Sequence, residues 1–148
     1  MFMVAFQTHS SLACTCSEFM PGQTSQKRLS DEEINAARFD RAKDVVRGKF
    51  TFLSLGPDVR RGFTVKMHVD ETIKGNLSGE IELVTGFGNG DCGLFATVVN
   101  LMFYDRPIEI EIQNSPVYQP GSSGINMCGY IRQPEPLQPL PSTKPRDQ

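Results

Sequence analysis

The sequence lacks a long apolar run and an excess of positive charge, and each absence excludes a class of protein. No stretch approaches the roughly 20 apolar residues that a helix needs to cross a bilayer, so we expect no transmembrane segment. Lys and Arg number 15 against 17 Asp and Glu, which gives a formal net charge of -2. Without a broad cationic surface, nucleic acid is not an expected partner.

Histidine is scarce, which limits hydrolytic chemistry. The chain has only His9 and His68, and strand alternation places His68 on a polar face, whereas a Ser or Cys nucleophile needs a base in contact with it. Glu109 and Glu111 share one strand face, where a glycosidase-like pair could form, but neighbouring acids of this kind are usually plain surface. We therefore expect no enzymatic activity and no cofactor.

The chain does contain enough apolar material for one core. It has 148 residues, of which 39% are hydrophobic and 22% charged, which fits a single folded domain. Four cysteines are present, at Cys14, Cys16, Cys92 and Cys128. No C-x-x-C spacing accompanies them, so two disulfides are favoured over a metal site, and disulfides indicate an exported protein.

The N-terminus agrees with export. Residues 1–6 are apolar and uncharged, and Ser11-Leu12-Ala13 places small residues at the -3 and -1 positions of a signal-peptidase site. This predicts a signal peptide at residues 1–13, cleavage before Cys14, and a secreted, periplasmic or cell-surface location. Two alternatives stay open: a native apolar strand in an intracellular protein, or a weak lipobox with a lipid anchor on Cys14.

The remaining sequence predicts one helix followed by strands. Ser30 and Glu33 form an S-x-x-E capping box, so a helix should run from Asp31 to near Asp44. Alternation and β-branched residues predict strands at 45–55, 63–69, 80–85, 94–104, 108–112 and 125–131. Residues 133–148 hold five of the ten prolines and no periodicity, which predicts an extended, mobile and disordered tail.

Short strands with frequent turn signals indicate a mainly β fold. We expect a small closed five- to six-stranded Greek-key barrel of the oligonucleotide/oligosaccharide-binding (OB) type, with one or two short helices, over residues 14–132. Residues 88–93 fit the dinucleotide motif G-x-G-x-x-G. That motif needs a helix at its third glycine, and because 94–104 is predicted as a strand, we interpret these glycines as a tight turn beside Cys92.

A family resemblance begins at the Cys14-Thr15-Cys16 triplet. It continues through A-K-D-V-V-R-G-K-F at 42–50, F-T-V-K-M at 63–67, I-K-G at 73–75, E-I-E-L-V at 80–84, C-G-L-F at 92–95 and I-N-M-C at 125–128. With these pieces in order, the chain resembles the N-terminal inhibitory domain of the tissue inhibitors of metalloproteinases (TIMPs), and more widely the netrin-like modules.

The resemblance implies disulfides Cys14–Cys92 and Cys16–Cys128. It also implies that the α-amine and carbonyl of Cys14 chelate the zinc of a target metalloproteinase, while the side chain of Thr15 enters its specificity pocket. The expected partner is a metalloproteinase or another extracellular protein. Since many netrin-like modules bind partners without inhibiting a protease, a non-inhibitory binding or structural module remains the alternative, beside the lipoprotein.

Overall fold

The computed structural model describes Cys16 and residues 29–55, 62–88, 92–114 and 122–133. The expected signal peptide, Cys14, Thr15 and residues 134–148 of the tail lie outside these residues. Helices and strands follow in the order α1 (Asp31–Arg41), β1 (Asp44–Leu55), β2 (Phe63–Lys74), β3 (Gly79–Thr85), α2 (Phe95–Phe103), β4 (Ile108–Asn114), β5 (Ser123–Gly124) and β6 (Ile131–Arg132).

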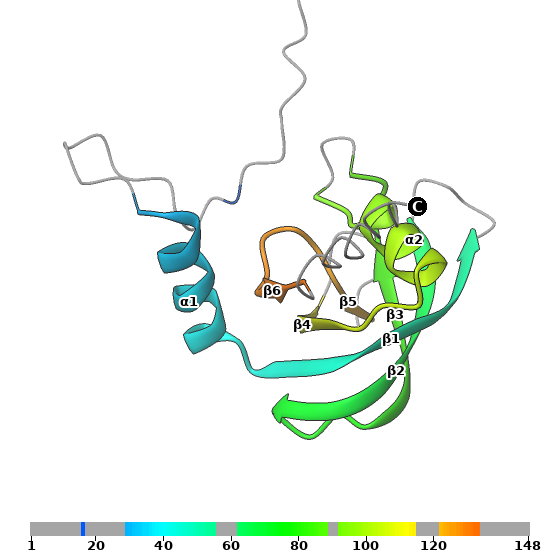
Figure 1. Cartoon of the computed structure of the whole chain (residues 1–148), viewed down its shortest axis with the longest axis horizontal. Helices are drawn as coiled ribbons and strands as arrows, with labels where there is room; N and C mark the ends of the chain where they lie inside the picture. The colour runs from blue at the N-terminus through cyan, green and yellow to red at the C-terminus, as the bar shows by residue number, and fades with distance from the viewer. Residues whose placement is uncertain (1–15, 17–28, 56–61, 89–91, 115–121, 134–148) are drawn as a thin grey trace, which may run out of the picture.

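Five of these strands close into a barrel, which confirms the predicted fold class (Figure 1). The strands are bonded in the order β1-β2-β3-β5-β4, and a further β1–β4 pairing closes the circle. The β3–β5 pair is parallel and the other pairs are antiparallel. β6 is an additional strand on β4. This is the strand order of an OB-type barrel, and closure leaves few open sheet edges.

β1 makes closure possible because it pairs with two strands at once. Its residues from Asp44 to Gly48 pair with β4, while its length from Val45 onward pairs with β2 through three register irregularities. At Gly48 a β-carbon would stand 2.0 Å from the carbonyl oxygen of His68, so only glycine allows the two strands to approach this closely. β1 can therefore bend around the barrel.

The core fills the barrel interior with aliphatic side chains. Alternate residues of the strands point inward, and α2 closes one end. The buried cluster consists of Val46, Phe50, Val65, Met67, Val69, Leu83, Leu94, Val98, Leu101, Ile108, Ile110, Ile112 and Ile125. Burial of this apolar surface is the main source of stability in a domain of this size.

The strand predicted at 94–104 is wrong, because these residues form α2. Leu94, Val98 and Leu101 are buried at helical spacing, whereas Val99 and Phe103 are exposed, so the apolar pattern has a helical period. β-branched residues lower helix propensity only slightly, and packing of the helix against the barrel outweighs that preference.

A helix therefore does follow the glycine motif at 88–93, contrary to the expectation. Its first N–H groups are used within the protein, since Leu94 donates to Thr85 Oγ1 at 2.8 Å and Phe95 donates to the Gly86 carbonyl at 3.3 Å. A β-carbon on Gly93 would lie 1.9 Å from the carbonyl carbon of Gly86. The absence of a side chain at Gly93 thus allows two backbone segments to pack closely.

The strand predicted at 125–131 is also wrong. Ile125 is buried, residues 126–129 turn, and only Ile131 and Arg132 pair, as β6, with β4. The capping-box helix is confirmed: Ser30 accepts from Glu33 N–H at 3.2 Å and Glu33 accepts from Ser30 N–H at 2.7 Å. It ends at Arg41, short of the predicted Asp44, because Asp44 already belongs to β1.

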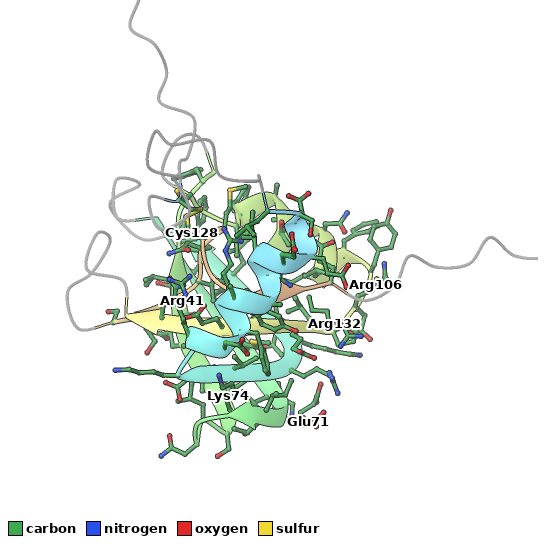
Figure 2. The ribbon with its side chains drawn as sticks, turned by 90° about the vertical axis from the view of Figure 1, so that its left-hand side faces the viewer. Arg41, Glu71, Lys74, Arg106, Cys128 and Arg132 are labelled. Carbon is green, nitrogen blue, oxygen red and sulfur yellow. A yellow bond between two sulfur atoms is a disulfide. The ribbon has the colours of Figure 1, made fainter. Side chains whose placement is uncertain are left out.

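α1 lies across the outside of the barrel beside β6 (Figures 1 and 2). Phe39 and Ile73 pack on a small second cluster of Ala42, Val45 and Tyr130. The Lys74 ammonium donates to the carbonyl of Phe39 at 2.7 Å and stands 4.8 Å from its ring centre. A cation at the C-terminal end of a helix is favourable, so β2 helps to hold α1 in place.

Candidate functional site

Cys16, Cys92 and Cys128 gather at the turn before β6. Cys16 and Cys128 form a disulfide with their Cα atoms 5.4 Å apart, which is the second pair that the resemblance implied. The bond links residues separated by 112 positions in the sequence. It therefore fixes the residue two positions after Cys14 to the barrel.

Cys92 lies beside this bond. It is itself disulfide-bonded, and its Sγ is 3.9 Å from Sγ of Cys128. Its carbonyl accepts a hydrogen bond from Met127 N–H at 2.9 Å. Cys92 has a φ of 58°, an uncommon conformation for a side-chain-bearing residue, so the glycine-rich segment turns sharply at this position.

Asn126 holds the turn that carries Cys128. Its Oδ1 accepts from Cys128 N–H at 2.9 Å, and its Nδ2 donates to Gln113 Oε1 of β4 at 2.8 Å. From α1, Arg38 Nη1 donates to the carbonyl of Met127 at 3.2 Å. The cysteine cluster, defined as Cys16, Cys92 and Cys128, is thus fixed by both β4 and α1.

The other predicted site residues divide into two groups. Cys14 and Thr15 lie outside the described residues, so their proposed roles and the Cys14–Cys92 pair stay predictions. His68 is exposed on β2, and its Nε2 lies 3.9 Å from the carboxylate of Asp70. Among the described residues, no three His, Cys, Asp or Glu side chains are placed to hold a metal ion.

The reading of Glu109 as plain surface is wrong. Glu109 is only 6% exposed, because α1 and the segment leading to β6 cover the outer face of β4 at this point. Its Oε1 accepts from the Tyr130 hydroxyl at 2.5 Å, and its Oε2 accepts from Arg47 at 2.8 Å. Arg47 also pairs with the exposed carboxylate of Glu71.

These contacts change how Glu109 and Tyr130 titrate. Burial acts to raise the pKa of Glu109, but the hydrogen bonds from Tyr130 and Arg47 outweigh it, and the pKa lies below its ordinary value. Burial and the hydrogen bond to Glu109 raise the pKa of Tyr130 to about 12. Glu109 is therefore ionised and Tyr130 neutral over the physiological range.

Glu111 is part of the same arrangement. Its Oε2 accepts from Tyr130 N–H at 2.9 Å, and its own N–H donates to the Tyr130 carbonyl at the same distance. Both carboxylates thus bind the backbone or side chain of Tyr130. We interpret Arg47, Glu109, Glu111 and Tyr130 as a polar clamp that holds the segment before β6.

Hollows of modest size flank the clamp. One of about 390 Å³ lies between α1 and the barrel, over Glu109 and Tyr130. A smaller one of about 100 Å³ is lined by Arg47, Pro107, Ile108, Glu109, Arg132 and Gln133. The sequence pattern pairs Glu109 with Glu111 on one face of β4, but alternation along a strand does not reveal what covers that face.

Comparisons with protein-family models, with curated proteins and with solved structures found no match to this chain. Within the described residues, neither helix is long and apolar enough to cross a membrane.

Proposed function

We propose that the protein is an exported, non-enzymatic inhibitor of a zinc metalloproteinase, acting through an N-terminal Cys14. The mature chain would begin at this residue, whose α-amine and carbonyl oxygen bind the zinc of the target. The single observation that carries the proposal is the cysteine cluster, because it fixes Cys16 against Cys128 and Cys92 at one place on the barrel.

The cluster constrains where Cys14 can be. Two residues of extended chain span about 7 Å at most, so the α-amine of Cys14 has to lie close to Cys16. Cys92 is disulfide-bonded, and Cys14 is the one cysteine of the sequence beyond the three in the cluster. We therefore propose Cys14 as the partner of Cys92, which would hold both ends of the Cys14-Thr15-Cys16 triplet.

An N-terminal residue held in this way is suited to chelation. An α-amine has a pKa of about 8, so it loses its proton readily and becomes a nitrogen ligand for zinc. The adjacent carbonyl oxygen completes a five-membered chelate and displaces the water that the protease needs for hydrolysis. Fixing the geometry in advance lowers the entropy cost of binding, and Thr15 then projects into the pocket beside the zinc.

Inhibition by two matched chains tests the proposal. A chain that starts at Cys14 should inhibit at least one enzyme of a broad metalloproteinase panel, whereas the same chain with one alanine before Cys14 should not. The extra residue turns the amine into a peptide nitrogen and leaves the barrel unchanged. Equal inhibition by both chains, or none by the first, would exclude chelation and favour the non-inhibitory binding module.

The side chain of Thr15 provides a second, graded test. Thr15→Gly should weaken inhibition by about 10- to 200-fold, corresponding to roughly 1–3 kcal/mol of lost pocket contacts, while the chelate remains. An unchanged inhibition constant would show that Thr15 does not enter the pocket.

A further inference from the structure

The C-terminal end of α2 presents an exposed pair of aromatic rings. Phe103 is 80% exposed and Tyr104 56%, and their ring centres are 5.0 Å apart in an edge-to-face arrangement. Val99, one turn earlier on the helix, is 40% exposed. We call these three residues the aromatic platform. Clustered apolar side chains at a surface commonly mark a binding site.

The platform stands on a fixed base. Tyr104 N–H donates to the Asn100 carbonyl at 3.1 Å, and Arg106 N–H donates to the Leu101 carbonyl at 2.9 Å. Lys49 of β1 forms an ion pair with Asp105 at 2.9 Å. The backbone below the two rings is therefore held by the helix and by the barrel, so the rings present a defined surface.

Before the proline-rich tail, the described part of the chain ends near the segment that follows α2. β6 finishes at Arg132, and Gln133 lines the same small hollow as Pro107. Pro107 follows Tyr104 by three positions, and Figure 2 shows Arg106 and Arg132 on the same side of the ribbon. Gln133, the residue before the proline-rich segment, thus lies near the segment that connects α2 to β4.

The composition of those residues fits an aromatic surface. They contain five prolines together with Leu137 and Leu140. Proline-rich segments adopt a polyproline II helix that costs little entropy to order, and such helices bind shallow surfaces lined by aromatic rings. At about 3.1 Å per residue, the eight residues from 134 to 141 would extend about 25 Å, enough to cross the end of a nine-residue helix.

We propose that residues 134–141 of the same chain bind the aromatic platform as a polyproline II helix. We take the occupant to be intramolecular because Gln133 lines the same hollow as Pro107, three positions after Tyr104, and a short tether gives an effective concentration in the millimolar range. An intrinsic Kd of about 1 mM would therefore already leave the segment bound about half of the time. The proposal does not depend on protease inhibition.

Nuclear magnetic resonance of the intact chain tests this contact. The methyl signals of Leu137 and Leu140 should differ from those of a free peptide of residues 133–148. In a Phe103→Ser, Tyr104→Ser double variant they should return to the peptide positions. Leu29→Ser is the matched control, since Leu29 is a 45% exposed apolar residue before α1, and it should leave these signals unchanged.

A second measurement tests the contact without the double variant, in case that variant loses its structure. The chain truncated after Gln133 keeps both aromatic residues, and addition of the 133–148 peptide at millimolar concentration should shift the amide signals of Val99 and Tyr104. Coincidence of the Leu137 and Leu140 signals in the wild-type chain with those of the free peptide would overturn the proposal. Shifts that grow with protein concentration would overturn it too, since the occupant would then be a second copy.

Discussion

Glu109 combines burial, charge and hydrogen bonding in one side chain, so its substitution tests the polar clamp most directly. Glu109→Gln keeps the size but removes the charge that Arg47 and Tyr130 bind. We expect a loss of about 1–3 kcal/mol in the free energy of unfolding at pH 7, measured by urea titration. Glu82→Gln, an exposed residue on β3, should change it by less than about 0.5 kcal/mol. Equal effects would show that the clamp does not stabilise the fold.

Because the pKa of Glu109 is lowered, the difference in unfolding free energy between wild type and Glu109→Gln should depend on pH. A carboxyl group whose pKa is lower in the folded state stabilises the protein above its unfolded pKa, near pH 4.3, and loses that contribution as the pH falls through the folded value. The gap between wild type and Glu109→Gln should therefore shrink when both are unfolded in urea at pH 3. A gap that stays constant from pH 7 to pH 3 would contradict the lowered pKa of Glu109.

The contribution of Tyr130 to stability should depend on pH in the opposite direction. Its pKa is raised to about 12, so folding favours the neutral phenol, and this contribution is present below pH 10 and lost as the pH rises through 12. Ultraviolet titration of the native protein should show a tyrosine phase near pH 12 that is missing in Tyr130→Phe. A titration in which wild type and Tyr130→Phe give the same late phase would refute the assignment.

At the level of secondary structure, Asn35 fastens α1 to the edge of β6. Asn35 Nδ2 donates to the Ile131 carbonyl at 2.9 Å, and Asn35 Oδ1 accepts from Ile131 N–H at 3.3 Å. One amide thus forms the two hydrogen bonds that a neighbouring strand would supply. This protects a short edge strand from pairing with another chain.

Replacement of Asn35 should loosen this contact. Asn35→Ala removes both hydrogen bonds, and we expect faster amide exchange at Ile131 together with a loss of about 1–2 kcal/mol in stability. Asn35→Asp retains the acceptor but not the donor, so its stability should lie between those of the wild type and Asn35→Ala. If amide exchange at Ile131 is the same in Asn35→Ala as in the wild type, α1 does not protect this edge.

The elements also show how far a sequence can be interpreted without structure. Local signals are sufficient for the start of α1, whose capping residues Ser30 and Glu33 act within one turn. They are also sufficient for residues 63–69 of β2, where alternation is regular, although β2 continues to Lys74. The β-branched and aromatic residues of α2 favour a strand, whereas packing against the barrel decides the outcome.

The clamp could not be predicted for a similar reason. Whether Glu109 is surface or interior depends on α1 and β6, which approach β4 from distant parts of the sequence. Alternation along a strand assigns a residue to a face but does not say what covers that face. By contrast, the Cys16–Cys128 bond was reached through the order of motifs around the cysteines, since spacing alone allows several pairings.

At the scale of the whole molecule, the tail and the barrel should be thermodynamically separable. Deletion of residues 133–148 should change the free energy of unfolding by less than about 0.5 kcal/mol, because a proline-rich segment on an exposed surface buries little area. Thermal and urea unfolding of both chains measure this. A loss of several kcal/mol would place the domain boundary further toward the C-terminus.

The proposed inhibitor begins at Cys14, with a free α-amine and with its thiol bonded to Cys92. Intact-mass measurement with non-reducing peptide mapping tests this proposal most directly, because it reports the first residue, any added lipid and the cysteine pairs together. We expect a chain starting at Cys14 without added mass, with Cys14–Cys92 and Cys16–Cys128 peptides. A lipid on Cys14, a different first residue, or a free thiol at Cys14 would contradict it.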